Sequence, residues 1–573
     1  MVIVDTLGSC EAMRTLVPRL SGSPSHGDRP TGGLHGLTEL AAVLFGFAIL
    51  TVALTWPLAL APGRLAYEPA NGDGQFSVWV VSWVARTLVS DPAHVFDANI
   101  FYPHQRTLLY SEPNLAAGAL AIPVYWATRN PYAAHNAVLL LSFVLAAASM
   151  YYLARHLAGD RFAAGVSAIA FAFCPYAFAH LLHIHLLMTA GLPLGLLAFH
   201  RLADRPSAGR GVVLGLVMAA QGFASGYYAV FVALTVGYAA LATAAVRRLW
   251  VNKPYWYSLA LAAAVGALVM LPLLVPLTSL QREIGFNRSL DASRQFSASW
   301  HAYLSSGKTL HAWLQGLAVR GQDLLFPGLL ATVFGTLGAV MGWRTGGQRR
   351  ETAVLYGSIV GLAFWASLGP KAGLYRLLYA TLPAFSLMRA PSRFGLLVVL
   401  GLSALGAIAI STLLTRVRRR VLVGATLIAL AVAESLAPLR ISARPEVGPA
   451  YRQLATLPDG ALLELPVYSR TLGFIRARYM VDSTAHWKPL VDAYSDFIPP
   501  DFLERADMIG QFPTREGLKE AARVPFRYAM FHLDKYQADA RAALFVRLAQ
   551  YAPCLRRLYG DDATLLYEVV GCP

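Results

Sequence analysis

The stretch RFGLLVVLGLSALGAIAISTLLTRVRRR, residues 393–420, joins a long apolar run to a cluster of arginines. A run of about 20 apolar residues is enough for a helix to cross the hydrocarbon core of a membrane. Residues 394–414 contain no charged side chain. Because arginines at the end of such a run mark the cytoplasmic side of a membrane protein, this stretch predicts a membrane-spanning helix with its C-terminal end in the cytoplasm.

Similar runs recur over most of the chain. Its 573 residues are 56% hydrophobic and 14% charged, whereas a soluble domain carries about 25% charged residues. The runs of suitable length are 37–58, 133–154, 162–179, 184–200, 211–226, 228–246, 257–279, 324–343, 353–369, 393–414 and 421–438. We therefore expect a mainly α, polytopic transmembrane helix bundle of about eleven spans over residues 37–440.

The basic residues indicate how the bundle is oriented. Lys and Arg cluster at alternate ends of the apolar runs, as in Arg155/Arg161, Arg247/Arg248 and Arg416/Arg418. By the positive-inside rule these ends face the cytoplasm. Residues 1–36 are then a cytoplasmic tail without the pattern of a secretory signal, and an odd number of spans places the C-terminal end outside. Since the basic residues form short clusters and no single basic face, the net charge of +16 does not predict nucleic-acid binding.

Three outer loops are expected, over 59–132, 280–323 and 370–392. Residues 75–88 of the first loop are too short to span, and their Trp79 and Trp83 are typical of a membrane interface. Residues 113–128 are also apolar, but counting them as a span would reverse every later basic cluster. We therefore interpret 113–128 as re-entrant or interfacial, so that the first outer loop holds two helices at the membrane surface.

The composition changes near residue 441, and we expect a small soluble α/β domain over 441–573 on the outer side. The expected elements are strands at 461–467 and 526–533, helices within 501–523 and 537–550, and a hairpin turning at Gly560-Asp561-Asp562. Cys554 and Cys572 flank the hairpin. Its geometry would allow a disulfide, and two free thiols are an equal alternative.

The first outer loop offers a candidate catalytic carboxylate. Asp73 lies in NGDGQ, between two glycines and directly before the predicted interfacial helix. This position would place a carboxylate at the boundary of water and lipid, with backbone that lets a substrate approach closely. The alternative is a structural role for Asp73, as an ordinary Asx turn or the N-cap of the helix.

Three histidines at the outer junction of two predicted spans form a second candidate group: His180, His183 and His185 of AHLLHIHLL. Histidines at this spacing could bind phosphate or the hydroxyl groups of a substrate. They could also pack at the interface, or bind zinc together with a carboxylate. We predict no metal site, because the four cysteines show no zinc-ligand spacing.

Basic residues on the expected outer side form the third group. They are exceptions to the positive-inside rule. They are Arg282, Arg288, Lys308, Arg389 and Arg393. Arginine can hold phosphate or carboxylate through two parallel hydrogen bonds, so these residues are candidates for binding an anionic substrate. The alternatives are contacts with lipid headgroups, or salt bridges to Glu283 or Asp291.

Several familiar signatures are missing from the chain. It has no G-x-x-x-x-G-K-[ST] phosphate loop, no G-x-S-x-G nucleophile elbow and no H-E-x-x-H metal helix. This argues against an ATP-driven pump and an intramembrane metalloprotease. A lipid or polysaccharide transporter, a flippase, and a non-catalytic membrane assembly protein remain alternatives to an enzyme.

The arrangement resembles the C-superfamily (GT-C) membrane glycosyltransferases, which use polyprenyl-phosphate sugars. The stretches GDGQFSVWVVSWVARTL, FDANIFYPHQRTLLYSEPNL, FCPYAFAHLLHIHLL, LMRAPSRFG and STAHWKPLVDAYSDFIPP are similar to those of uncharacterised bacterial proteins of this type, over nearly the whole chain. The resemblance implies a multi-pass protein of the bacterial inner membrane with a periplasmic C-terminal domain. It also implies transfer of a sugar from a lipid-linked donor to a hydroxyl group of a glycan, lipid or protein.

The resemblance assigns the loop-one catalytic carboxylate to Asp73, as the base of an inverting reaction. Many members carry a second acid nearby, where this chain has Gln75, and this departure implies catalysis without a metal ion or other cofactor. The outer histidines and basic residues would neutralise the lipid-phosphate leaving group. Weaker candidates for acceptor binding are Glu112, His486, Trp487 and Tyr494, for which ordinary loop packing is the alternative.

Overall fold

The computed structural model describes residues 33–316, 323–468 and 470–571. Most of the predicted cytoplasmic tail, 1–36, therefore lies outside the described residues, as does Cys572 of the possible disulfide. Residues up to Phe45 form a unit separate from Gly46–Pro573, and the boundary falls within helix α1 (Gly33–Leu54). All other helices and strands belong to the second unit.

Every predicted span has a helical counterpart. Seven helical segments within the described residues are long and apolar enough to cross a membrane, and the chain is a multi-pass membrane protein. They are α1, α4 (Pro131–Ala158), α5 with α6 (Arg161–Ala172 and Pro175–Ala179), α7 with α8 (Ile184–Leu187 and Gly191–Asp204), α10 (Gly226–Arg247), α11 (Lys253–Ile284) and α16 (Gly395–Arg416). Four shorter or less apolar helices match the remaining runs: α9 (Ala208–Ala224), α13 (Leu329–Thr345), α14 (Gly347–Ser367) and α17 (Arg420–Glu434). The count of eleven therefore stays a prediction.

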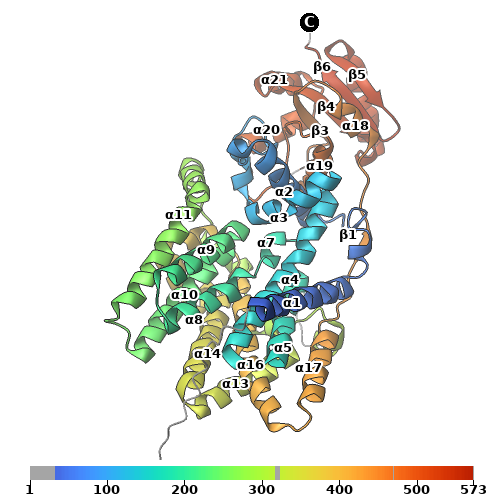
Figure 1. Ribbon diagram of the computed structural model, residues 1–573. Coiled ribbons are helices and arrows are strands. Elements are labelled where there is room, and N and C mark those ends of the chain that lie inside the picture. Colours follow the sequence, from blue (N-terminus) through green and yellow to red (C-terminus); the bar gives the residue numbers. More distant parts are fainter. Residues whose placement is uncertain (1–32, 317–322, 469, 572–573) are drawn as a thin grey trace, which may run out of the picture. The chain divides into compact units, whose positions relative to one another are not determined.

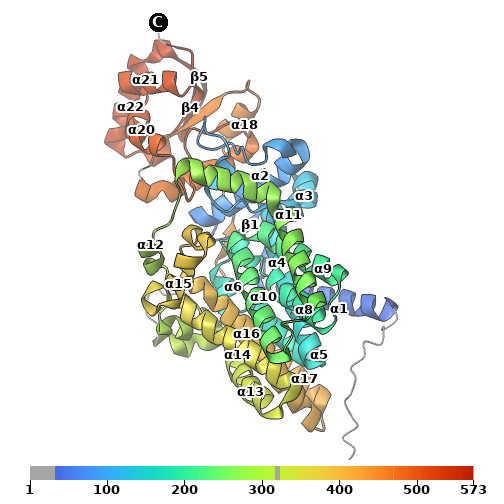
Figure 2. The ribbon, with the colours of Figure 1, turned by 90° about the vertical axis from the view of Figure 1, so that its left-hand side faces the viewer.

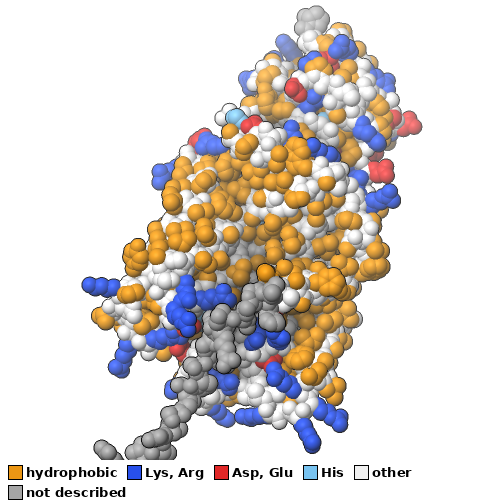
Figure 3. All heavy atoms as spheres, viewed as in Figure 1, with side chains coloured by type: hydrophobic (Ala, Val, Ile, Leu, Met, Phe, Trp, Pro, Cys, Tyr) orange, Lys and Arg blue, Asp and Glu red, His pale blue; other side chains and the backbone are white. Residues whose placement is uncertain are grey.

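Helices α4, α5 and α16 form the centre of the helix bundle, and most of their side chains are buried (Figure 1). Figure 3 shows hydrophobic side chains across the helical part of one face, with Lys and Arg gathered toward its ends. This distribution is that of a helix bundle with an apolar outer surface suited to lipid. Both ribbon views place α2 (Gly72–Ser90) and α3 (Leu115–Thr128) at the end of this bundle nearest the C-terminal sheet (Figures 1 and 2).

Helices α2 and α3 form the two helical parts of the predicted first outer loop. At 14 residues, α3 is too short to span a membrane, which agrees with the interpretation of 113–128. The prediction for the tryptophans of α2 is wrong: Trp79 and Trp83 are 0% and 7% exposed, so they do not face lipid. Their indole N–H groups donate to Asn99 Oδ1 at 3.1 Å and to the Val95 carbonyl at 2.9 Å, and these bonds hold the rest of the loop against α2.

The C-terminal region contains a four-stranded sheet of order β3-β4-β6-β5. Its strands are β3 (Ala461–Leu465), β4 (Phe526–His532), β5 (Leu555–Gly560) and β6 (Thr564–Val569), and its helices are α18 (Pro449–Ala455), α19 (Ala477–Asp482), α20 (Pro500–Gly510), α21 (Arg515–Arg523) and α22 (Ala538–Gln550). Strands β3 and β4 run parallel, while β6 pairs antiparallel with both β4 and β5. The predicted strands, helices and hairpin are therefore all confirmed.

A second, two-stranded sheet was not predicted. Strand β1 (Leu65–Tyr67) pairs antiparallel with β2 (Ile441–Ala443). Beside it, Arg440 lies 3.4 Å from Glu68. The sheet joins the start of the first outer loop to the start of the C-terminal region. Its strand β1 ends five residues before α2 begins.

Candidate active site

Asp73 lies in the first turn of α2, where a carboxylate interacts favourably with the helix dipole. The helix is capped by Asn71, whose Oδ1 accepts the Asp73 backbone N–H at 3.0 Å, so the alternative of Asp73 as the N-cap is wrong. The flanking glycines permit close packing: a Cβ on Gly72 would come within 2.5 Å of the Phe474 carbonyl, and one on Gly74 within 2.9 Å of Leu182. The Asp73 side chain remains 42% exposed.

Two side chains from distant parts of the chain contact the Asp73 carboxylate. The Tyr494 hydroxyl donates to Oδ1 at 2.8 Å, and His183 Nε2 lies 3.5 Å from Oδ2. The bond from His183 is the main cause that lowers the pKa of Asp73, with smaller contributions from Tyr494 and the positive charge of Arg389, although partial burial opposes them. Asp73 is therefore an ionised hydrogen-bond acceptor at neutral pH.

The three histidines follow one another around the junction of α6 and α7. The rings of His180 and His183 lie 6.0 Å apart, as do those of His183 and His185. Burial lowers the pKa of His180 to about 3, so it is neutral, and one of its ring nitrogens lies 2.8 Å from the Tyr176 carbonyl. His183 Nδ1 is buried without a hydrogen-bond partner. Among the described residues, no three His, Cys, Asp or Glu side chains are arranged to hold a metal ion.

Three of the predicted arginines lie near this group. Arg288 and Arg389 lie 3.2 and 3.3 Å from the two carboxylate oxygens of Asp496, a residue that the sequence did not single out. The guanidinium of Arg393 lies 3.9 Å from the ring centre of Tyr227. The Tyr227 hydroxyl in turn accepts the backbone N–H of Arg389 at 2.9 Å.

The segment 490–497 brings Tyr494 and Asp496 to the first outer loop. Near its start, Tyr102 donates its backbone N–H to the Leu490 carbonyl at 2.8 Å, and Leu490 donates to the Asn99 carbonyl at 3.0 Å. At its end, the Phe497 N–H donates to the Tyr110 carbonyl at 3.0 Å. Because both ends of the segment are tied to the loop, the residues between them are held over Asp73.

The remaining predicted residues have other surroundings. Arg282 is exposed, while Lys308 is buried, donates to the Ser435 carbonyl at 2.7 Å and lies over the Phe178 ring. Lys308 also lines a cavity of about 460 Å³ with residues before α2 and after α17. His486 stacks on Tyr451, and Trp487 packs against Trp83 and Arg86.

The side chain of Glu112, in the first outer loop, contacts the start of α10. Its Oε1 accepts the Gly226 N–H at 2.8 Å. Burial raises the pKa of Glu112 to about 7, although this hydrogen bond and the charge of Arg393 oppose the shift. The folded state therefore keeps a proton that the unfolded chain releases between about pH 4.5 and about pH 7. It follows that the contribution of Glu112 to stability falls as pH rises through this window.

Replacing Glu112 with Gln removes this titration and keeps an acceptor for Gly226. We expect Glu112→Gln to raise the melting temperature of the detergent-purified protein at about pH 8 and to raise it less, or lower it, at about pH 5. Glu516→Gln, in the exposed first turn of α21, is the matched control. Equal shifts of the Glu112 variant at both pH values would contradict the predicted titration of Glu112.

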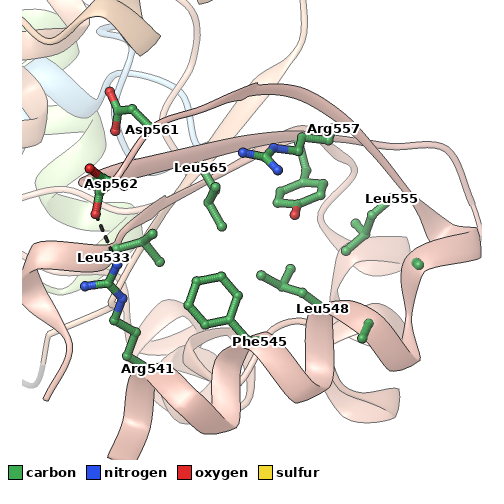
Figure 4. Close-up of a pocket in the computed structure, with 12 residues that line it drawn as sticks. Leu533, Arg541, Phe545, Leu548, Leu555, Arg557, Asp561, Asp562 and Leu565 are labelled. Atoms are coloured by element: carbon green, nitrogen blue, oxygen red, sulfur yellow. Dashed lines mark hydrogen bonds between the residues drawn. The ribbon is translucent and has the colours of Figure 1, made fainter. Parts of the chain in front are cut away.

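A further cavity, of about 480 Å³, lies in the C-terminal region between α22 and the β5–β6 hairpin. Figure 4 shows Phe545 and Leu548 on one side and Arg557 on the other, with Asp561 and Asp562 near one end. Arg541 donates to the Asp562 carbonyl at 3.2 Å. None of the residues that line this cavity belongs to the group around Asp73.

Comparison with solved structures shows which known folds the chain resembles. Arabinofuranosyltransferase AftD from mycobacteria superposes with a TM-score of 0.57 at 15% identity, covering 94% of this chain and 42% of AftD. The chain thus spans less than half of AftD. The oligosaccharyltransferase of Archaeoglobus fulgidus gives a TM-score of 0.48 at 13% identity, over 92% of this chain and 74% of that one. ArnT from Cupriavidus metallidurans gives 0.39 at 13% identity, over 93% and 98%.

The likeness to AftD confirms the predicted fold class, a mainly helical membrane bundle with a small C-terminal α/β region. At this level of identity the likeness concerns the fold alone. No protein-family model matches the chain, and no curated protein matches it in sequence.

Proposed function

We propose that the protein is a membrane glycosyltransferase that transfers a sugar from a polyprenyl-phosphate donor to an acceptor hydroxyl group, with Asp73 as the base. The observation that carries this proposal is the Asp73 carboxylate itself, ionised, partly exposed and surrounded by His183, Tyr494 and Arg389. AftD, whose fold the chain shares, is an arabinofuranosyltransferase. The shared fold supports the reaction class. The proposed donor and acceptor are inferred from the residues of the candidate site.

In the proposed reaction the acceptor oxygen attacks the anomeric carbon as its proton passes to Asp73. The new bond forms opposite the bond to the lipid phosphate, which breaks and leaves as polyprenyl phosphate, so the configuration at the anomeric carbon inverts. One carboxylate suffices because phosphate is a good leaving group that needs no protonation. Nearby arginines stabilise the charge that develops on it.

The same proposal assigns the two sides of the membrane. The site and the C-terminal sheet would face the outside of a bacterial inner membrane, with the N-terminus in the cytoplasm. The arginine-rich ends of α10, α13 and α16, at Arg247, Arg344 and Arg416, support this orientation by the positive-inside rule. The apolar surface of the bundle would hold the polyprenyl tail, and the acceptor would be a glycan, a lipid or a protein.

The test is a transfer assay with the full chain in liposomes, supplied with polyprenyl-phosphate sugars and a set of acceptors. We expect sugar to appear on an acceptor hydroxyl, with the opposite anomeric configuration and an equal amount of polyprenyl phosphate. A fluorescent lipid-linked sugar in the same vesicles reports movement between leaflets. Movement without transfer would replace the proposal by a lipid transporter, one of the alternatives that the sequence leaves open.

A further inference from the structure

The carboxylate of Asp496 lies between two cations from separate outer segments. Its oxygens are 3.2 Å from Arg288, which follows α11, and 3.3 Å from Arg389, which precedes α16. The Ser111 hydroxyl also donates to Asp496 at 3.3 Å. Arg288 and Arg389 thus form an anion site. The membrane part supplies both arginines, and the C-terminal segment supplies the anion that they hold, the Asp496 carboxylate.

The geometry shows that Asp496 does not use all the N–H groups that Arg288 and Arg389 can donate. Each arginine approaches Asp496 through one terminal nitrogen. Charge-assisted N–H···O contacts are normally shorter, about 2.7–2.9 Å, and a guanidinium often makes two of them to one carboxylate. In addition, Arg288 Nε is buried without a hydrogen-bond partner. An anion with three oxygens, such as a phosphate group, could accept more of these N–H groups than the carboxylate does.

The anion site is electrostatically coupled to Asp73. The charge of Arg389 helps to lower the pKa of Asp73, and the charge of Asp496 helps to raise that of Tyr494. Tyr494 and Asp496 are two residues apart in the segment 490–497, and Tyr494 occupies one oxygen of the Asp73 carboxylate. The C-terminal segment thus blocks part of the candidate base and part of the cation pair together.

We propose that Asp496 is an internal competitor for the phosphate group of the lipid-linked donor, and that the donor displaces it from Arg288 and Arg389. This inference rests on the proposed function and concerns the regulation of the same site. Displacement of Asp496 would shift Tyr494 as well, which frees Asp73 Oδ1 for the acceptor hydroxyl. The base would then become available only after the donor is bound.

The test measures binding of farnesyl phosphate, a short polyprenyl phosphate, to the detergent-purified full chain by calorimetry. We expect Asp496→Asn to bind farnesyl phosphate about tenfold more tightly than the natural protein, because the ion pairs with which the phosphate competes are weakened. Farnesol, which has the same tail and no phosphate, should bind both proteins equally. Asp501→Asn, whose acid pairs with Arg505 and His104 in the same region, should leave both affinities unchanged.

The possible outcomes separate the two proposals. If the natural protein binds farnesyl phosphate and Asp496→Asn binds it equally or more weakly, Asp496 braces the arginines and the inference is overturned while the donor class stands. If neither protein shows binding that depends on the phosphate, the donor class is overturned together with the inference. Tighter binding of farnesol as well would show that the substitution opens the site to the tail, which also overturns competition for phosphate.

Discussion

Asp73→Asn should lower the rate of sugar transfer by about 10²–10⁴-fold, the range that a general base contributes. Asn keeps an oxygen that can accept the Tyr494 hydroxyl, and its backbone N–H can still bond to the Asn71 cap. The substitution therefore removes the proton acceptor and leaves the start of α2 intact. Initial rates with a polyprenyl-phosphate sugar, at saturating donor and acceptor, measure the effect.

The matched control is Asp91→Asn at the other end of the same helix, where Asp91 pairs with the exposed His94. It makes the same chemical change in the same loop, and we expect transfer to continue at the natural rate. Both variants should remain folded at the temperature of the assay, because neither substitution creates a buried unpaired group. Transfer by Asp73→Asn at the rate of the Asp91 control would remove Asp73 from catalysis and leave it a structural role at the start of α2.

The helices could be predicted from the sequence because spanning a membrane depends on local composition. A run such as 394–414 excludes charge over its whole length, and α16 extends over it at Gly395–Arg416. The C-terminal strands were predictable for the same reason. Their short runs are bounded by turns, and those of β4 and β6 contain aromatic or β-branched residues.

Asp73 and the histidines were also within reach of the sequence, because polar groups that cluster in outer loops of an apolar protein are unusual. The contact of Tyr494 with Asp73 was not within reach. The contact with Tyr494 joins residues 421 positions apart, and the segment that carries Tyr494 is held by bonds such as the one from Asn99 to Ser483, across 384 positions. The spacing of hydrophobic residues along the chain indicates local structure and cannot predict contacts between residues so far apart. The same bonds explain why Trp79, expected at the membrane interface, is buried against Asn99.

Arg476 anchors the segment that completes the site, and its replacement should have the largest effect on stability. Arg476 and Asp492 are both fully buried, with 3.1 Å between Nη1 and Oδ1, and Arg476 also donates to the Ala493 carbonyl at 3.2 Å. Arg476→Met leaves the Asp492 carboxylate buried without its cation. Removing one partner of a buried pair costs about 3–5 kcal/mol of unfolding free energy, which denaturant titration of the purified protein in detergent can measure.

The pH dependence of this loss distinguishes an unpaired carboxylate from a simple cavity. Burial already raises the pKa of Asp492 to about 7, even though Arg476 opposes the shift, and removal of Arg476 should raise it further. A folded pKa above the unfolded one means that stability is lost as pH rises. Arg476→Met should therefore be less destabilising at about pH 5 than at about pH 8, whereas a cavity would cost the same at both.

Two further variants complete the comparison. Replacing both partners, Arg476→Met with Asp492→Leu, should recover part of the loss, because no buried charge is left unpaired. Arg505→Met, which breaks a partly exposed pair with Asp501, should cost less than about 1 kcal/mol. If the double variant is as unstable as Arg476→Met, the arginine acts through its bonds to the Tyr468 and Ala493 carbonyls. The backbone of the segment, and not the charge of Asp492, would then be what Arg476 holds in place.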